Sequence, residues 1–150
     1  MTESMNVFNR AAVRLHRDRA ATNLSAHDFL FAESAERLAD RLDDVTRSFP
    51  LALDLGCHGG ELARALGGRG GIETLIQSDL SPALAALAHD KGGLALASDE
   101  EVLPFAEMSL DLILSNLSLH WVNDLPGMLV QVRQALKPDG LFLAAALGGN

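Results

Sequence analysis

Residues 51–63, Leu-Ala-Leu-Asp-Leu-Gly-Cys-His-Gly-Gly-Glu-Leu-Ala, decide the fold of this chain. An apolar run typical of a strand reaches Asp54 and Leu55 and then passes through glycines into residues typical of a helix. A strand that turns directly into a helix needs torsions and close approaches that a Cβ resists, which explains Gly56 and Gly60. The stretch therefore predicts a small-molecule site at the end of a strand.

The carboxylate in this stretch indicates which ligand the site takes. The pyrophosphate of a dinucleotide rests on a helix N-terminus, where a nearby carboxylate such as Asp54 would repel it. The G-x-G-x-x-G dinucleotide pattern also fails, because His58 occupies its second glycine position. A ligand with an ammonium and a sulfonium group would gain from the charge of Asp54. We therefore expect a class I fold that binds S-adenosyl-L-methionine, with Asp54, Gly56, Cys57 and Gly60 contacting this cofactor.

Length and composition limit the alternatives. A chain of 150 residues suits one domain, and 48% hydrophobic with 21% charged residues is typical of a globular protein. The formal net charge of −8 makes a nucleic-acid partner unexpected, because phosphate binding needs a basic surface. No apolar run is long enough to cross a membrane, so stable membrane insertion is not expected either.

Cysteine and histidine usage bears on compartment and metals. Cys57 is the only cysteine, which excludes an intrachain disulfide and fits a reducing compartment. We expect a cytoplasmic protein. The alternative is the mitochondrial matrix, because the N-terminus carries several arginines, although Glu3 and Asp18 are atypical of a transit peptide. The five histidines are scattered without ligand spacing, so we expect no metal site.

Two helical segments are expected in an N-terminal arm formed by residues 1–48. Over residues 7–21 apolar residues recur at helical spacing, while Arg10, Arg14 and Arg17 line another face. We expect a solvated basic face; the alternative is that this face covers the cofactor or meets a partner. A second helix is expected over residues 26–45, and its predicted inward-facing residues are Phe29, Leu30, Leu38, Leu42 and Val45.

The remaining residues, 49–150, are expected to form the cofactor-binding core. Short apolar runs alternate with helical stretches, which predicts an α/β fold with three layers, Rossmann-like, around a parallel sheet. Ligands in such folds bind at the carboxyl ends of the strands. The chain stops directly after its fifth expected strand, so we expect it to be truncated. The expected strands are 51–55, 72–77, 94–97, 110–115 and 141–147, and the helices between them are 61–66, 82–89 and 126–136.

Carboxylates follow the second and third expected strands. Asp79, followed by Leu80, is placed to accept hydrogen bonds from the ribose hydroxyls; the alternative for Asp79 is the N-cap of the next helix. Asp99 is placed to accept from the adenine amine. Glu100 is included with it, although Glu100 and Glu101 taken individually are typical of a solvated loop.

Polar residues after the fourth expected strand lie where the methyl group and its acceptor would meet. Asn116 is expected beside the reacting methyl group, and His120 and Trp121 at the substrate entrance. Asn116 and His120 are weak catalytic candidates, because methyl transfer to a good nucleophile depends mainly on positioning. A lone histidine beside a tryptophan is more often a packing residue. For Cys57 we likewise favour packing over a nucleophilic role, because it has no evident base.

These residues, in this order, resemble the class I S-adenosylmethionine-dependent methyltransferases of the type 11 group. More narrowly, the chain resembles the mitochondrial complex I assembly factor 5 family. The most specific likeness is Ser-Leu-His-Trp-Val-Asn-Asp-Leu-Pro at residues 118–126, joined by residues 6–10, 18–21, 49–57 and 136–140.

The resemblance implies S-adenosylmethionine binding and two kinds of reaction. The assembly factor family is associated with hydroxylation of an arginine in a respiratory complex I subunit. A related family, the malonyl-acyl-carrier-protein methyltransferases, esterifies a carboxylate. The implied partners are therefore a respiratory complex subunit or an acyl carrier protein. A non-catalytic cofactor-binding assembly module is a further alternative, because His58 stands where the family has glycine.

Overall fold

The computed structural model describes residues 9–21, 29–91 and 93–146, and its centre is one parallel sheet. The strands are β1 (Leu51–Leu55), β2 (Thr74–Asp79), β3 (Leu94–Ala97), β4 (Leu110–Asn116) and β5 (Leu136–Ala145). Their order across the sheet is β3-β2-β1-β4-β5, and every neighbouring pair is parallel. This arrangement confirms the predicted α/β fold.

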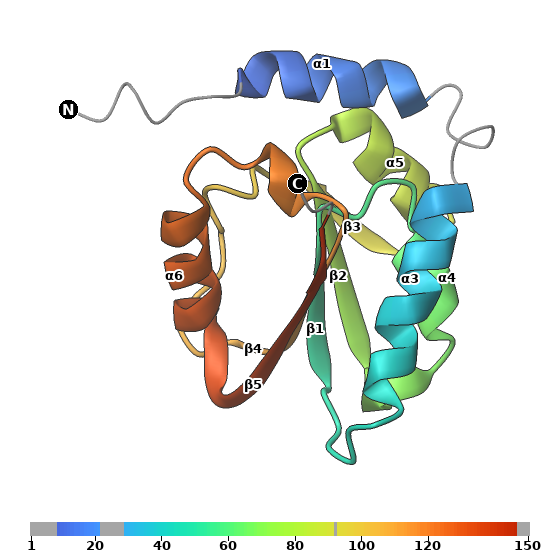
Figure 1. The fold of residues 1–150 in the computed structure, drawn as a ribbon, viewed down its shortest axis with the longest axis vertical. Coiled ribbons are helices and arrows are strands. Elements are labelled where there is room, and N and C mark those ends of the chain that lie inside the picture. The colour runs from blue at the N-terminus through green and yellow to red at the C-terminus, as the bar shows by residue number, and fades with distance from the viewer. Residues whose placement is uncertain (1–8, 22–28, 92, 147–150) are drawn as a thin grey trace.

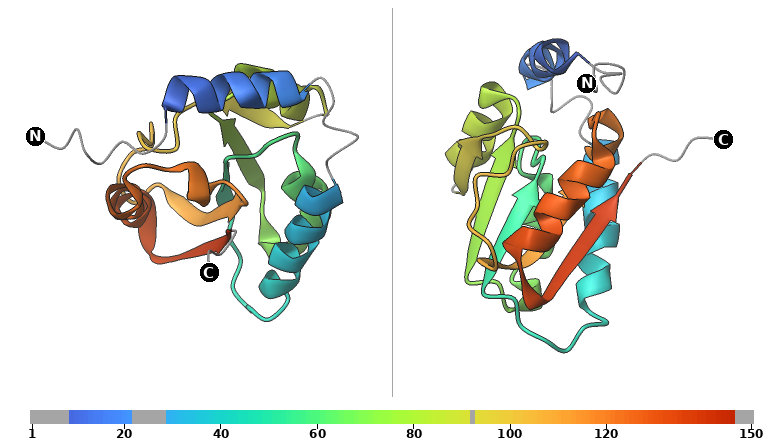
Figure 2. Two further views of the ribbon diagram at one scale, coloured as in Figure 1. Left: turned by 45° about the horizontal axis from the view of Figure 1, so that its top comes forward. Right: turned by 90° about the vertical axis from the view of Figure 1, so that its left-hand side faces the viewer.

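Helices cover both faces of the sheet, which gives three layers (Figure 1, Figure 2). On one face α3 (Phe29–Leu42) and α4 (Glu61–Leu66) pack against Ala52, Leu112 and Leu114. On the other face α6 (Leu125–Ala135) packs against Leu53, Leu55 and Ile113. A further helix, α5 (Pro82–Asp90), links β2 and β3. The strands of the sheet centre are buried on both sides, which explains their continuous apolar sequence.

The helix α1 (Arg10–Ala20) lies across the carboxyl ends of the strands (Figure 1). It begins where the side chain of Asn9 accepts a hydrogen bond from the amide of Ala12 at 3.2 Å, which is an N-cap interaction. The expected helix start at residue 7 lies outside the described residues. The helix α1 therefore lies directly over the edge of the sheet where a ligand is expected.

The inward face predicted for α3 is partly wrong. Leu38 and Leu42 are buried and Val45 packs against them, but Phe29 is 74% exposed and Leu30 is 45% exposed. The buried residues of α3 are Ala35, Leu38, Ala39 and Leu42, a stripe with helical spacing. Extending that stripe backward by three or four residues passes over Phe29 and Leu30, which explains why both are exposed.

The end of the chain also differs from expectation. The helix α6 ends at Ala135, and β5 begins at once with Leu136 opposite Leu110. The register then shifts, so that Leu141 pairs with Leu112.

In the part of the chain that the structure describes, no helix is both long and apolar enough to span a membrane.

Candidate cofactor site

A turn with left-handed backbone joins β1 to α4. The φ angles of Gly56 and Gly60 are +78° and +89°. A Cβ on Gly56 would lie 2.3 Å from Oγ of Ser118, so the turn has no room for a side chain there. The amides of Gly56 and Cys57 both donate to the carbonyl of Ser78 at 2.8 Å, which fixes the turn to the end of β2.

His58 keeps the left-handed backbone that a glycine would adopt more easily, with a φ of +50°. Its ring stacks on Phe31 of α3, with ring centroids 4.1 Å apart. Its Nε2 lies 2.7 Å from the carbonyl oxygen of Asn116, and its amide donates to Oδ2 of Asp79 at 2.9 Å. These contacts offset the backbone strain and tie α3, the turn and β4 together.

Two carboxylates beneath the turn have no compensating partner. Asp54 at the end of β1 and Glu61 at the start of α4 are both buried, and their carboxylate oxygens accept no hydrogen bond from any described residue. Burial raises the pKa of Asp54 well above its ordinary value, and the charges of Glu61 and Asp79 raise it further. A bound cation would relieve this cost, so the charge of the two carboxylates matches that of an ammonium group.

Asp79 ends β2 and is fully buried. Its Oδ1 accepts from the amide of Ser81 at 2.9 Å and from Nη1 of Arg17 at 3.2 Å, while Oδ2 accepts from His58. The alternative role as N-cap of α5 is wrong, because Ser81 caps that helix by accepting from Leu84. Leu80 follows as a half-buried residue.

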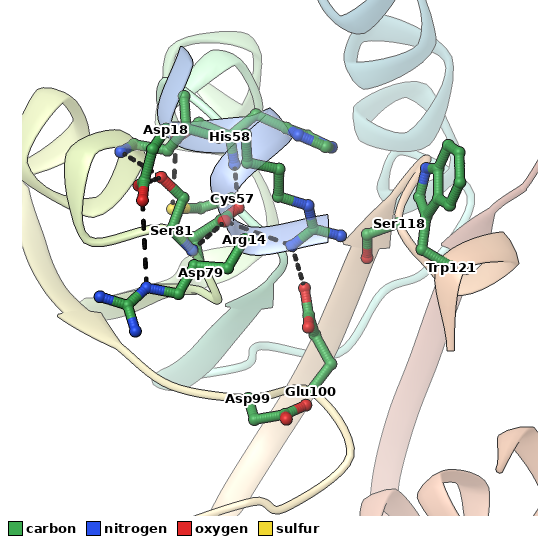
Figure 3. Close-up of polar contacts among 12 residues, drawn as sticks. Arg14, Asp18, Cys57, His58, Asp79, Ser81, Asp99, Glu100, Ser118 and Trp121 are labelled. Atoms are coloured by element: carbon green, nitrogen blue, oxygen red, sulfur yellow. Dashed lines mark hydrogen bonds and ion pairs between the residues drawn. The ribbon is translucent and has the colours of Figure 1, made fainter. Parts of the chain in front are cut away.

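The acidic loop after β3 carries an arginine network. Glu100 is completely buried, so the solvated-loop interpretation is wrong for this residue. Its Oε1 lies 2.6 Å from Nη1 of Arg17 and its Oε2 lies 2.5 Å from Nη2 of Arg10. Arg10 also reaches Asp99 at 2.7 Å and Glu101 at 2.9 Å. Figure 3 shows how Asp79, Asp99 and Glu100 lie around this part of α1.

The basic face of α1 is therefore not a uniformly solvated surface. Arg14 is exposed as expected, but Arg17 is buried and the side chain of Arg10 is only 16% exposed. Burial by itself lowers the pKa of a guanidinium, but the neighbouring carboxylates outweigh it and raise the pKa of Arg10 and Arg17. Arg10 and Arg17 are seven residues apart, which places them on one side of a helix as the sequence predicted, but their acidic partners are distant in the sequence and gave no signal there.

The end of β4 supplies a further unpaired polar atom. Nδ2 of Asn116 donates to the carbonyl of Phe31 at 2.9 Å, while the buried Oδ1 finds no donor among the described residues. His120 and Trp121 belong to the short helix η4 (Leu119–Trp121). The side chain of His120 lies outside the described part of the structure, so its role stays a prediction.

Cys57 is buried within the turn. Burial raises the pKa of its thiol far above the ordinary value, and the charges of Asp54, Asp79 and Glu61 act in the same direction. The thiol is therefore neutral and a poor nucleophile, which supports packing rather than catalysis.

Sequence-distant residues thus meet at one edge of the sheet: the glycine turn, the carboxylates after β1, β2 and β3, and Asn116 after β4. Among the described residues, no group of three or more His, Cys, Asp or Glu side chains is arranged to hold a metal. A glycine turn with acidic strand ends on an open parallel sheet is typical of the class I, Rossmann-like methyltransferases, whose cofactor is S-adenosylmethionine.

The chain belongs to the family described as "Methyltransferase domain", which matches residues 53–144. It is 44% identical to the mitochondrial arginine-hydroxylase NDUFAF5 of Danio rerio, over 99% of this chain and 47% of that protein. It is 33% identical to the malonyl-[acyl-carrier protein] O-methyltransferase of Methylovorus sp. (strain MP688), over 99% of this chain and 54% of that protein. The chain therefore spans about half the length of these relatives.

Solved structures agree with this assignment. The methyltransferase in complex with the Trm112 methyltransferase activator of Haloferax volcanii superposes with a TM-score of 0.81 at 25% identity. The match covers 89% of this chain and 60% of that structure. The predicted family and fold are thus confirmed, whereas the division at residue 48, the truncation and the individual cofactor contacts stay predictions.

Proposed function

We propose that the chain is the cofactor-binding part of an S-adenosylmethionine-dependent methyltransferase, with its site at the glycine turn. The observation that carries this proposal is a pair of buried carboxylates, Asp54 and Glu61, that have no hydrogen-bond partner among the described residues and lie beneath a turn with no room for a side chain at Gly56. The cofactor supplies an electrophilic methyl group on a sulfonium. A cationic ligand matches this charge distribution better than a polyphosphate does.

Different residues of the chain contact different parts of the cofactor. Asp54 orients the amino acid end, beside the close backbone approach at Gly56, Cys57 and Gly60. Asp79 accepts from the ribose hydroxyls and Leu80 contacts the nucleoside. Asp99 and Glu100 would accept from the adenine amine, and Asn116 would lie beside the transferred methyl group. Their contribution is to position the reacting groups and to exclude water.

Calorimetry with S-adenosylhomocysteine tests this assignment. Asp79→Asn keeps the size of the side chain but removes its charge, and we expect it to weaken binding by about tenfold or more. Asp90→Asn is the matched control, because Asp90 is exposed at the far end of α5 and should not change the affinity. Thermal unfolding of each variant checks that it is folded. The absence of saturable binding to a folded wild-type chain would reject the proposal.

A second candidate reaction is arginine hydroxylation, which the relatives named arginine-hydroxylase support. The two reactions differ in the mass added to the acceptor, about 14 Da for a methyl group and about 16 Da for an oxygen atom. Mass spectrometry of a protein acceptor separates them, after incubation of the complete protein with the cofactor and, for hydroxylation, with dioxygen and a two-electron reductant. The acceptors to try are a respiratory complex subunit and an acyl carrier protein, following the names of the two groups of relatives.

A non-catalytic assembly module remains the third candidate, and His58 supports it by replacing the glycine of the motif. Such a module would take up one cofactor without modifying any acceptor.

For the compartment we propose the cytoplasm, in keeping with a single buried cysteine, and the mitochondrial matrix as the alternative, in keeping with the names of the relatives. Fractionation of cells expressing the complete protein tests this choice.

A further inference from the structure

The acidic groups assigned to the nucleoside are already occupied by another part of the chain. Asp79, Asp99 and Glu100 each pair with a guanidinium from α1, at distances between 2.5 and 3.2 Å. Arg17 is itself buried, so its guanidinium lies between Asp79 and Glu100 and not on the surface above them. The nucleoside and the guanidiniums therefore draw on the same three carboxylates.

We propose that Arg10 and Arg17 are internal competitors of the cofactor, so that its nucleoside displaces the two arginines when it binds. This inference rests on the proposed function. The α1 helix holds the acidic residues while the site is empty, and releases them when ribose hydroxyls and the adenine amine take over their acceptor oxygens.

Electrostatics explain why an empty site needs such a substitute. Four carboxylates, those of Asp79, Asp99, Glu100 and Glu101, approach one another closely, and two of them have no exposure to water. Without counter-charges their repulsion and desolvation would destabilise the fold. The two guanidiniums supply these charges while no ligand is bound.

The hydrogen-bonding groups of the Arg17 guanidinium are not all paired, which makes an exchange feasible. Its Nη2 is buried and has no acceptor among the described residues. Its bond to Asp79, at 3.2 Å, is also longer than its bond to Glu100, at 2.6 Å. A ligand that pairs fully with Asp79 replaces a weak interaction, so the exchange costs less than removal of an ideally paired arginine.

A separate contact holds α1 near the site after the exchange. Oγ of Ser81 donates to Oδ1 of Asp18 at 2.5 Å, at the start of α5 (Figure 3). This contact does not use the acceptor oxygens of Asp79 or Glu100. The first turns of α1, which carry Arg10, can thus separate from the acidic cluster while the C-terminal half of α1 stays attached to α5, and in that half only the side chain of Arg17 has to move.

Hydrogen exchange of the wild-type chain with and without S-adenosylhomocysteine tests the proposal. The expected result is slower exchange in the glycine turn at residues 56–60, together with faster exchange over the first turns of α1. Slower or unchanged exchange in α1 beside a protected glycine turn would overturn the competition and leave the proposed function standing. No protection in either segment would reject the proposed function, and the competition with it.

Matched arginine variants give an independent readout by calorimetry. Arg17→Met removes the competitor, and we expect S-adenosylhomocysteine to bind at least about fivefold more tightly. Arg14→Met is the control, because Arg14 lies on the same helix with an exposed side chain and should leave the affinity unchanged. Weaker binding by a folded Arg17→Met chain would show that the arginine supports the cofactor and would overturn the proposal. If this variant fails to fold, the wild-type exchange measurement still decides.

Discussion

Asp54 shows how one residue links stability to function. Its carboxylate is buried, unpartnered and close to Glu61, so its charge is costly in the folded chain. A residue selected for stability alone would be paired or apolar at this position. Unpaired buried charge at the end of a strand is instead typical of a site that awaits a ligand of opposite charge.

Asp54→Asn should stabilise the folded chain and weaken the binding of the cofactor. Because the folded state raises the pKa of Asp54, the folded chain binds its proton more tightly than the unfolded chain does. Stability therefore falls as the pH rises above the ordinary value of 3.8. The amide carries no charge, so at pH 7 we expect a gain of about 1 kcal/mol, or about 3 °C in Tm.

Thermal unfolding between pH 4 and pH 8 checks this expectation. The variant should show a smaller decline of Tm with rising pH than the wild type, and weaker binding of S-adenosylhomocysteine. Asp90→Asn again serves as the exposed control. A loss of stability at pH 7 in Asp54→Asn would mean that the carboxylate has a favourable partner, contrary to the account given above.

At the scale of the elements, α3 and α1 cover different parts of the sheet. The buried stripe of α3 packs on β1, β4 and α4, and so belongs to the hydrophobic core. The buried residues of α1 are Val13 and Arg17, so this helix is held by ion pairs more than by apolar packing. Elements held mainly by polar contacts detach more readily than core elements do.

Two substitutions in α3 test this description of the core. Leu38→Ala removes a buried side chain and should lower the free energy of unfolding by about 2–4 kcal/mol. Phe29→Ala removes a larger side chain that is exposed, and should change the free energy of unfolding by less than about 0.5 kcal/mol. Urea denaturation measures both. Equal losses would show that the periodicity of the buried stripe has been assigned to the wrong face.

At the scale of the whole molecule, the regular spacing of apolar residues predicted the sheet and its strand ends, but not the contacts between distant residues. Alternating apolar runs and helical stretches predicted the parallel sheet, and strand ends predicted where Asp54, Asp79 and Asp99 would meet. The burial of Glu100 was not predictable in this way. It depends on Arg10, 90 residues away, and pairing between such distant residues leaves no local pattern. The stacking of His58 on Phe31 is long-range for the same reason.

The central claim is that acidic strand ends on this sheet bind a cationic nucleoside cofactor and not a dinucleotide. A crystal of the chain soaked with equal concentrations of S-adenosylhomocysteine and NADH tests it most directly. We predict S-adenosylhomocysteine at the glycine turn, with its ribose on Asp79 and its ammonium beside Asp54. NADH in that position, with S-adenosylhomocysteine absent, would contradict the account.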